Sequence, residues 1–489
     1  MEKAPVFDFC IIGGGYGALK LALHAIENKL TVCIIEPRLY VGGTSLHEGF
    51  TSKCLLTSSH KYFEAKNILK KHGVYAKDVT HDFSAMMRKK TDLFALVGAN
   101  NNRKLRDAGC VIYRGWGKIL SPYEVEVAEM NSQSQMSGSG NGGIATDPAM
   151  ATVKKFIVKC RNVVLNTGGE PIVLPSAVPL DGKRVVNSTQ CLSLASLPKS
   201  MIVVGGGFIG LEIGSVYAKL GCDVTVVEFY DRILAEFDGD ISRKMEEIFR
   251  EMGIKFLFNS KVTHWETKQD GVDVLIEDSH GGELRSSVEV LFVAVGRRPR
   301  TKGCGLETVG VELDARGRII VNDKLQTNIP NIYAVGDITN KGPAVAHKAA
   351  GQAFALVDQY LGRTTHLNYD LIPNVVYTQP EIASVGKTEE QLKKEGVDYK
   401  VGFSHLSDNT RAKSVEETDG FVKFLVENNT NKILGIHMIG PQAGEQIMEG
   451  VMGIEYAAKS EFVARISHGH PLFAEAFRDA AILATRAKL

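Results

Sequence analysis

Residues 7–36 read FDFCIIGGGYGALKLALHAIENKLTVCIIE, and this stretch decides the fold. An apolar run predicts a strand, the glycines between Gly13 and Ala18 predict a tight turn, and a helix and a second strand follow. The second strand ends in Glu36. Glycines let the backbone approach a pyrophosphate at the helix N-terminus, and the carboxylate accepts hydrogen bonds from a ribose. The stretch therefore predicts a dinucleotide-binding unit.

The same arrangement recurs at 201–228, which reads MIVVGGGFIGLEIGSVYAKLGCDVTVVE. Again a strand leads into a glycine turn, a helix and a second strand, which ends in Glu228. One glycine motif alone is a weak sign, whereas two complete strand–turn–helix–strand–acid units are a strong one. Two dinucleotides are therefore expected.

Composition bounds the remaining possibilities. A chain of 489 residues suggests about three domains. The net charge of +1 gives no sign of a nucleic-acid partner or an acidic membrane surface, and no apolar run is long enough to span a bilayer. The eight cysteines are scattered without a CxxC or CxxxxC pair, which favours buried thiols in a reducing compartment. No metal site is expected.

The last third changes character. Strands at 374–377 and 421–426 alternate with a helix at 388–395, a pattern typical of an antiparallel α+β domain. The predicted fold class is therefore α/β, with two Rossmann-like dinucleotide-binding domains followed by a C-terminal α+β domain. The Gly/Ser-rich segment 132–150 is expected to be a loop inserted in the first domain.

Further motifs carry a resemblance to a known family. They are NTGGEP at 166–171, VGRRP at 295–299, IYAVGD at 332–337, AHKA at 346–349, YTQPEIASVG at 377–386 and SHGHPLFAEAF at 467–477. Over essentially its whole length the chain resembles the dihydrolipoamide dehydrogenases, which are flavin-dependent pyridine nucleotide-disulfide oxidoreductases. The resemblance implies a homodimer and four segments: 1–170 in the FAD domain, 171–298 as the NAD domain, 299–368 returning to the FAD and central part, and 369–489 as the dimerisation domain.

The resemblance also implies the cofactors and their contacts. NAD(H) rather than NADP(H) is expected, because the carboxylate of Glu228 suits a ribose 2′-hydroxyl and repels a 2′-phosphate. The residues implied for FAD are Gly13, Gly15, Ala18, Glu36, Thr44, Lys53, Thr167, Gly168, Asp337 and Ala346. Those implied for NAD are Gly205, Gly207, Gly210, Glu228 and Gly296.

The chain departs from the family at 42–56, which reads GGTSLHEGFTSKCLL. In the family this segment carries two cysteines that pass electrons from the flavin to a disulfide. Here Ser45 and Phe50 stand in their places, and neither side chain undergoes thiol–disulfide exchange. The segment is also one residue shorter before Lys53. Cys54 is the one thiol nearby, and it is either activated by the helix N-terminus and Lys53 or, as we favour, an inert core residue.

The other catalytic residues of the family are present. Lys53 and Glu212 match an ion pair beside the flavin, where a cation stabilises negative charge on the reduced ring. His470 and Glu475 match the base and its orienting carboxylate, which come from the partner subunit. His470 either protonates another acceptor in the same cavity or is retained structurally at the dimer interface. A structural role is expected for His468.

Three functions compete. The first is an NADH oxidoreductase that passes electrons from FAD to a small-molecule acceptor: a quinone, a dye, oxygen or a second nicotinamide. The second is a dihydrolipoamide dehydrogenase with residual activity through Cys54. The third is a catalytically inactive flavoprotein that acts as a scaffold or sensor. We favour the first, because both nucleotide motifs are intact while the substrate site has changed.

The C-terminal residues Ala487-Lys488-Leu489 resemble the tripeptide read by the peroxisomal import receptor. The apolar strand near the N-terminus leaves no room for the presequence of mitochondrial family members. We therefore expect a peroxisomal or glycosomal matrix protein. The alternative location is the cytoplasm. The alternative interpretation of the tripeptide is that it is the frayed end of the last helix.

Overall fold

The structure, a computed structural model, describes residues 6–130, 152–174 and 180–486. The expected loop at 132–150 and the C-terminal tripeptide lie outside the described residues. The chain divides into two compact units. The first comprises Met1–Cys54, Ala85–Ile172 and Arg297–Tyr369, and the second comprises Leu55–Ser84, Val173–Gly296 and Asp370–Leu489. The division into four domain segments stays a prediction.

A seven-stranded sheet forms the core of the first unit, in the order β3-β2-β1-β6-β5-β4, with β17 also paired to β6. Strands β3, β2, β1, β6 and β17 run parallel to their neighbours, whereas β4 and β5 are antiparallel additions. The apolar run in β1 is buried on both faces of the sheet, as parallel strands require. The strands are β1 (Val6–Ile12), β2 (Val32–Ile35), β3 (Val111–Tyr113), β4 (Gly115–Ser121), β5 (Glu124–Met130), β6 (Thr152–Leu165) and β17 (Ile332–Ala334).

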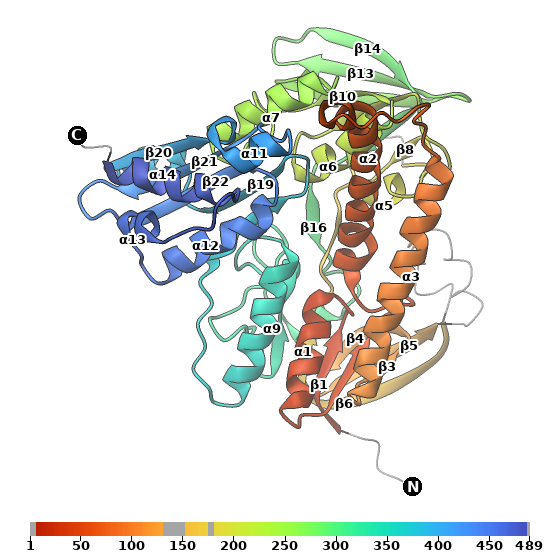
Figure 1. Ribbon diagram of the computed structural model, residues 1–489. Coiled ribbons are helices and arrows are strands. Elements are labelled where there is room, and N and C mark those ends of the chain that lie inside the picture. The colour runs from red at the N-terminus through yellow and green to blue at the C-terminus, as the bar shows by residue number, and fades with distance from the viewer. Residues whose placement is uncertain (1–5, 131–151, 175–179, 487–489) are drawn as a thin grey trace. The chain divides into compact units, whose positions relative to one another are not determined.

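Helices and a small ribbon complete this unit. Helix α1 (Tyr16–Glu27) packs against α9 (Ala346–Tyr360), and the two lie side by side in Figure 1. The ribbon pairs β7 (Gly169–Pro171) with β16 (Arg297–Pro299) in antiparallel register, where the chain leaves and re-enters the unit. The remaining elements are the π-helix η1 (Ser45–Phe50), α3 (Phe83–Asp107), α8 (Leu306–Val309) and the 3₁₀ turn η4 (Gly336–Ile338). Helix α2 (Thr51–Asn67) begins in this unit and belongs to the second unit from Leu55 onward.

The second unit contains the repeated nucleotide fold. Its parallel sheet has the order β11-β10-β9-β15-β8, and a separate antiparallel sheet joins β12, β13 and β14. The strands are β8 (Val185–Val186), β9 (Ser200–Val204), β10 (Asp223–Val227), β11 (Lys255–Leu257), β12 (Ser260–Thr267), β13 (Val272–Asp278), β14 (Glu283–Val288) and β15 (Val290–Val293). The helices are α5 (Ser188–Cys191), α6 (Phe208–Lys219) and α7 (Gly239–Glu251).

The C-terminal part of this unit is an antiparallel sheet in the order β18-β19-β22-β21-β20. Helix α14 (Glu475–Arg486) packs on β20 and β21, while α12 (Ala443–Glu455) packs on β19 and β22. The strands are β18 (Asn374–Val376), β19 (Glu381–Gly386), β20 (Tyr399–His405), β21 (Phe421–Glu427) and β22 (Ile433–Gly440), and the other helices are α10 (Glu389–Glu395), α11 (Thr410–Ser414) and α13 (Ser460–Arg465). The predicted α/β fold class with a C-terminal α+β domain is confirmed.

Candidate functional site

The turn after β1 is shaped for close approach of a ligand. Gly13 has a φ of +97°, and a Cβ there would lie 2.6 Å from the backbone oxygen of Asn166. Gly15 caps α1 without a side-chain hydrogen bond to the first amides of the helix. Backbone N–H groups at such a helix start favour a phosphate. The predicted role of these glycines therefore has a steric basis.

The carboxylate of Glu36 is hydrogen-bonded to this turn. Glu36 is buried, and its Oε2 accepts a hydrogen bond of 2.7 Å from the amide of Gly14. Its Oε1 accepts another of 2.9 Å from the amide of Arg38. Each carboxylate oxygen retains a lone pair for a further donor, such as a ribose hydroxyl.

A cleft of about 990 Å³ opens from this turn within the first unit. It is at the upper end of the range for ligand pockets, which run to roughly 1,000 Å³. Six of the residues predicted to contact FAD line it: Gly13, Gly15, Glu36, Thr44, Thr167 and Gly168. Of the others, Ala18 is fully buried inside α1, Ala346 is the first residue of α9, and neither they nor Lys53 and Asp337 are among the lining residues.

The cleft also contains residues that sequence reasoning missed. Arg38, Trp116 and Arg300 line it, and the guanidinium of Arg300 lies 4.8 Å from the ring centroid of Trp116. Among the described residues, the buried Nε of Arg38 and Nε1 of Trp116 have no hydrogen-bond partner. Cations and unused donors beside a glycine turn fit an anionic dinucleotide such as FAD. No residue spacing indicated Trp116, because it enters the cleft from β4.

Asp337 lies on η4, directly after β17. Asp337 is partly exposed, and the desolvation of its carboxyl group by the surrounding protein raises its pKa, while the cations of Lys348 and Arg297 oppose that rise. Gly336 next to it donates its amide to Oε1 of Gln352 at 2.7 Å, which fixes the turn. A carboxyl group at this turn can accept hydrogen bonds from hydroxyl donors, and its predicted contact with FAD stays a prediction.

The segment expected to depart from the family contains a helical stretch that includes Ser45. A π-helical turn, η1, covers Ser45–Phe50 and runs directly into α2. Phe50 thus lies inside a helical stretch rather than at its start. Polar side chains support the wide turn: His47 Nδ1 donates to the oxygen of Gly43 at 2.9 Å, and the Thr51 hydroxyl donates to the oxygen of His47 at 2.7 Å. Burial lowers the pKa of His47 to about 3, so this ring is neutral.

An ion pair between Glu48, in this segment, and Arg297, outside it, was not predicted from the sequence. Arg297 begins β16, and its Nη1 donates to Glu48 Oε2 at 2.8 Å. Its Nη2 donates to the oxygen of Gly169 at 2.7 Å and to the hydroxyl of Thr44 at 3.2 Å. Arg297 thereby joins the π-helix to both strands of the β7–β16 ribbon.

The cysteines are all free thiols, and all eight lie among the described residues. Cys54 in α2 is the one that is not buried. Its pKa is raised by partial burial, which the cations of Lys89 and Lys90 only oppose. An activating effect of the helix N-terminus is not observed, because the helix begins nine residues earlier, at Ser45.

The second unit repeats the geometry of the first turn. Gly205 has a φ of +106°, and a Cβ there would lie 2.6 Å from the oxygen of Ala294. Glu228 is buried and accepts from the amide of Gly206 at 2.5 Å and from the amide of Tyr230 at 2.9 Å. The two carboxylates thus receive hydrogen bonds from equivalent positions. Gly207 caps α6, and the remaining predicted contacts are Gly210 in that helix and Gly296, whose φ is +110°.

The predicted catalytic residues lie in different units. Lys53 belongs to the first unit, where its Nζ donates to the Ser52 hydroxyl at 3.3 Å. Glu212 is buried in α6 of the second unit, and its Oε1 accepts from the amide of Tyr377 at 2.8 Å. Their ion pair stays a prediction.

His470 and Glu475 are brought together by the second unit. His470 Nδ1 lies 3.0 Å from Glu475 Oε1, and the other oxygen of Glu475 accepts from the amide of Leu472 at 3.0 Å. These bonds hold the pKa of Glu475 below its usual value. The imidazole of His470 is 68% exposed, so its Nε2 is accessible in a single chain. His468 is instead held by Glu449 and the backbone oxygen of Ile466, which fits a structural role.

Metal-binding clusters and membrane-spanning helices are both absent from the described residues. No cluster of three His, Cys, Asp or Glu side chains suited to a metal ion occurs in the part of the chain that the structure describes. None of its described helices is long and apolar enough to cross a membrane.

Comparison with known proteins identifies similar enzymes. The chain is 41% identical over 477 residues to dihydrolipoyl dehydrogenase 1 of Arabidopsis thaliana, with 97% of this chain and 90% of the relative covered. It is 39% identical over 477 residues to leghemoglobin reductase of Glycine max, with 97% and 87% covered. The crystal structure of LpdA from Mycobacterium tuberculosis matches with a TM-score of 0.85 and 26% identity, over 98% of this chain and 99% of the other.

The comparisons correct the location expected from Ala487-Lys488-Leu489. Dihydrolipoyl dehydrogenases of Arabidopsis thaliana, Pisum sativum, Dictyostelium discoideum and Macaca fascicularis, 38–41% identical to this chain, carry the word mitochondrial in their names. The peroxisomal or glycosomal assignment is therefore wrong, because a three-residue pattern is outweighed by relatives that match the whole chain. The import receptor likewise gains no support as a partner.

Family profiles cover most of the sequence. The profile of the pyridine nucleotide-disulphide oxidoreductases matches residues 7–353, and that of their dimerisation domain matches 372–481, which indicates a homodimer. The predicted enzyme type and cofactors are confirmed: these are flavoprotein oxidoreductases of the dihydrolipoyl dehydrogenase type that use FAD and NAD(H). Two nucleotide turns of one design, a cleft suited to FAD and matches along the whole chain thus agree that this protein belongs to the pyridine nucleotide-disulphide oxidoreductase family.

Proposed function

We propose that this protein is an NADH-using, FAD-dependent oxidoreductase that passes electrons to a small acceptor without an internal disulfide. The acceptor is a quinone, a dye, oxygen or a second nicotinamide. One observation carries the proposal: the π-helix that resembles the family's redox segment contains Ser45 and Phe50 and no thiol. A hydroxyl or a phenyl ring at these positions cannot relay electrons by thiol exchange.

The binding residues follow from the two turns. In this proposal FAD is held by Gly13, Gly15, Ala18, Glu36, Thr44, Lys53, Thr167, Gly168, Asp337 and Ala346. NAD(H) is held by Gly205, Gly207, Gly210, Glu228 and Gly296. The buried and hydrogen-bonded carboxylate of Glu228 supports NAD(H), since its negative charge would repel a 2′-phosphate. The segments 1–170 and 299–368 form the FAD domain, 171–298 the NAD domain and 369–489 the dimerisation domain.

Bound FAD would accept a hydride from NADH and release two electrons to the acceptor. The residues of the chain prepare this exchange. Lys53 places a cation where negative charge develops, and Glu212 pairs with it. His470 carries the mobile proton at Nε2, because its Nδ1 is engaged by Glu475. A proton held there would serve an acceptor that becomes protonated on reduction.

An anaerobic titration of the purified holoprotein with NADH tests the proposal. We expect the visible absorbance of the flavin to bleach without the long-wavelength band of a thiolate–flavin charge-transfer complex. A flavin that stays oxidised would contradict the proposal and favour a scaffold or sensor. A charge-transfer band would show that a thiol takes part. Bleaching would be followed by a screen of quinones, dyes, oxygen and oxidised nicotinamides.

Lipoamide reduction is the second candidate, favoured by the names of the relatives. It would require Cys54, which is a single thiol with a raised pKa. Cys54→Ala in the holoprotein decides between the two. Lipoamide turnover that disappears in this variant would establish the second candidate, whereas NADH-dependent quinone or dye reduction should be unchanged.

A further inference from the structure

The ion pair between Glu48 and Arg297 is the feature of the altered segment that neither the nucleotide turns nor the proposed reaction explains. Glu48 lies in the middle of the π-helix, and Arg297 is the first residue of β16. The side chains are 11% and 15% exposed. The pair is therefore largely withdrawn from water, unlike the exposed pair between Arg298 and Glu170 on the same ribbon.

The guanidinium of Arg297 is shared among three acceptors. It reaches the carboxylate of Glu48, the hydroxyl of Thr44 and the backbone oxygen of Gly169. These lie at the start of the π-helix, in its middle and on the neighbouring strand β7. A charge-assisted fork of this kind fixes direction as well as distance. One side chain thus connects the helix to both strands through which the chain enters and leaves the unit.

The π-helical turn needs such a connection. Its wide hydrogen-bonding pattern is uncommon and is usually found as a short insertion at functional sites. Inside the segment, the supporting contacts come from His47, Thr51 and Ser52, which bond to the backbone of the same segment. These contacts shape the turn but do not attach it to the ribbon. Arg297 and Glu48 do.

We propose that the Glu48–Arg297 pair is a positioning pair that holds the π-helix on the β7–β16 ribbon by charge and hydrogen bonding, so that the helix keeps its place whatever the redox state of the protein's thiols. The inference rests on the proposed function, in which this segment contains no disulfide. The pair orients Thr44 directly and Lys53 through the helix, and both belong to the proposed FAD site. Neither Glu48 nor Arg297 is a catalytic residue in this account.

Hydrogen exchange of the FAD-loaded dimer, followed over residues 45–53, tests the pair. Glu48→Gln keeps the shape and removes the charge, and we expect it to speed local exchange by about tenfold or more, because a buried guanidinium loses its counter-charge. The visible circular dichroism of the bound flavin should change with it. Arg297→Gln should act similarly, and the double variant should add little to either single change.

A matched control separates positioning from general destabilisation. Asp314 pairs with Arg318 at 2.8 Å in the same unit, is partly buried and lies in a different turn. Asp314→Asn should lower overall stability without altering exchange at 45–53 or the flavin signal. If Glu48→Gln does not fold, Arg297→Lys supplies the test, since it keeps the charge but cannot reach three acceptors.

The inference is overturned if Glu48→Gln or Arg297→Lys exchanges as slowly as the unmodified protein over 45–53, or if Asp314→Asn has the same effect. It is also overturned if dithiothreitol alone speeds exchange there in the unmodified protein. These outcomes do not depend on turnover. A flavin that NADH cannot reduce would refute the proposed function while leaving the exchange result to decide the pair.

Discussion

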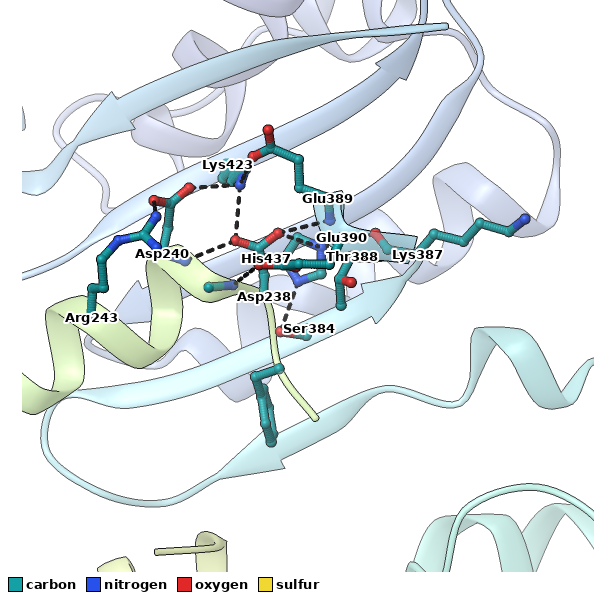
Figure 2. A network of polar contacts seen from close by, with 12 residues as sticks. Asp238, Asp240, Arg243, Ser384, Lys387, Thr388, Glu389, Glu390, Lys423 and His437 are labelled. Atoms are coloured by element: carbon teal, nitrogen blue, oxygen red, sulfur yellow. Dashed lines mark hydrogen bonds and ion pairs between the residues drawn. The ribbon is translucent and has the colours of Figure 1, made fainter. Parts of the chain in front are cut away.

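Removing the ammonium of Lys423 should destabilise the C-terminal part of the second unit more than any exposed charge change. Figure 2 shows this group, on strand β21, surrounded by carboxylates from two helices. Its Nζ donates to Asp238 at 2.9 Å, to Asp240 at 2.6 Å and to Glu389 at 2.5 Å. Lys423 is 1% exposed and Asp238 is fully buried. The sequence around 369–440 predicted the strand but not this network.

The size of the effect follows from burial. The interactions lower the pKa of Asp238 and lower that of Glu389 to about 2, so both carboxylates stay ionised at neutral pH. Lys423→Met would leave these carboxylates close together without the cation that neutralises them. Removing one partner from a buried ion pair costs about 3–5 kcal/mol. Local opening of β21 and of the first turn of α7 should therefore become on the order of 10²–10⁴-fold more frequent.

Native-state hydrogen exchange of the holoprotein measures this opening for each segment. The matched control is Lys393→Met, because Lys393 also bonds to Glu389, at 2.8 Å, but is 63% exposed. That change should cost less than about 1 kcal/mol. A Lys423→Met protein whose exchange in β21 equals that of Lys393→Met would refute the reasoning. Adding Asp238→Asn to Lys423→Met should recover part of the loss, since one unpaired charge disappears.

Three further predictions concern titration, cofactor choice and the glycine turn. Burial lowers the pKa of His437 below 6.5, so on acidification this histidine is protonated in the unfolded chain before it is protonated in the folded protein. The stability of the protein to urea should therefore fall as the pH drops below about 6.5, and His437→Asn should reduce the dependence of stability on pH. An unchanged dependence in this variant would exclude His437 as the cause. Glu228→Ala should weaken the preference for NADH over NADPH by roughly tenfold or more, measured from rates of flavin reduction, and an unchanged preference would show that the carboxylate does not read the ribose. Gly13→Ala should reduce the amount of FAD bound per chain, because the new Cβ would lie 2.6 Å from a backbone oxygen. Gly109 has the same φ of +97°, but a Cβ there would have no atom within 4 Å, so Gly109→Ala should retain FAD. An equal loss of FAD in both variants would implicate backbone strain alone.

Much of the nucleotide-binding fold was determined by the sequence alone. Gly13 and Gly205 occupy backbone conformations that favour glycine, and each approaches a neighbouring strand too closely for a side chain. Glu36 and Glu228 each follow their turn closely in the chain, and each bonds to that turn. The hydrogen bonds between these carboxylates and their turns join groups only 22 residues apart, so one short stretch of sequence contains both partners.

The tertiary structure decided the features that depend on distant partners. Arg297 and Glu48 are 249 residues apart, and Lys423 and Asp238 are 185 apart. No periodicity or spacing indicates which charges meet after such a separation, because the partners come together only when the chain has folded. The sequence therefore shows the charged residues but does not indicate which of them form ion pairs.

The altered segment combines both cases. The sequence determined that Ser45 and Phe50 carry no thiol, since that is a property of the residues themselves. Only the structure decided that the segment forms a π-helix from Ser45, and that burial raises rather than lowers the pKa of Cys54. The sequence determines which functional group each side chain carries. Whether that group is ionised depends on the water and charges around it, and the fold determines these.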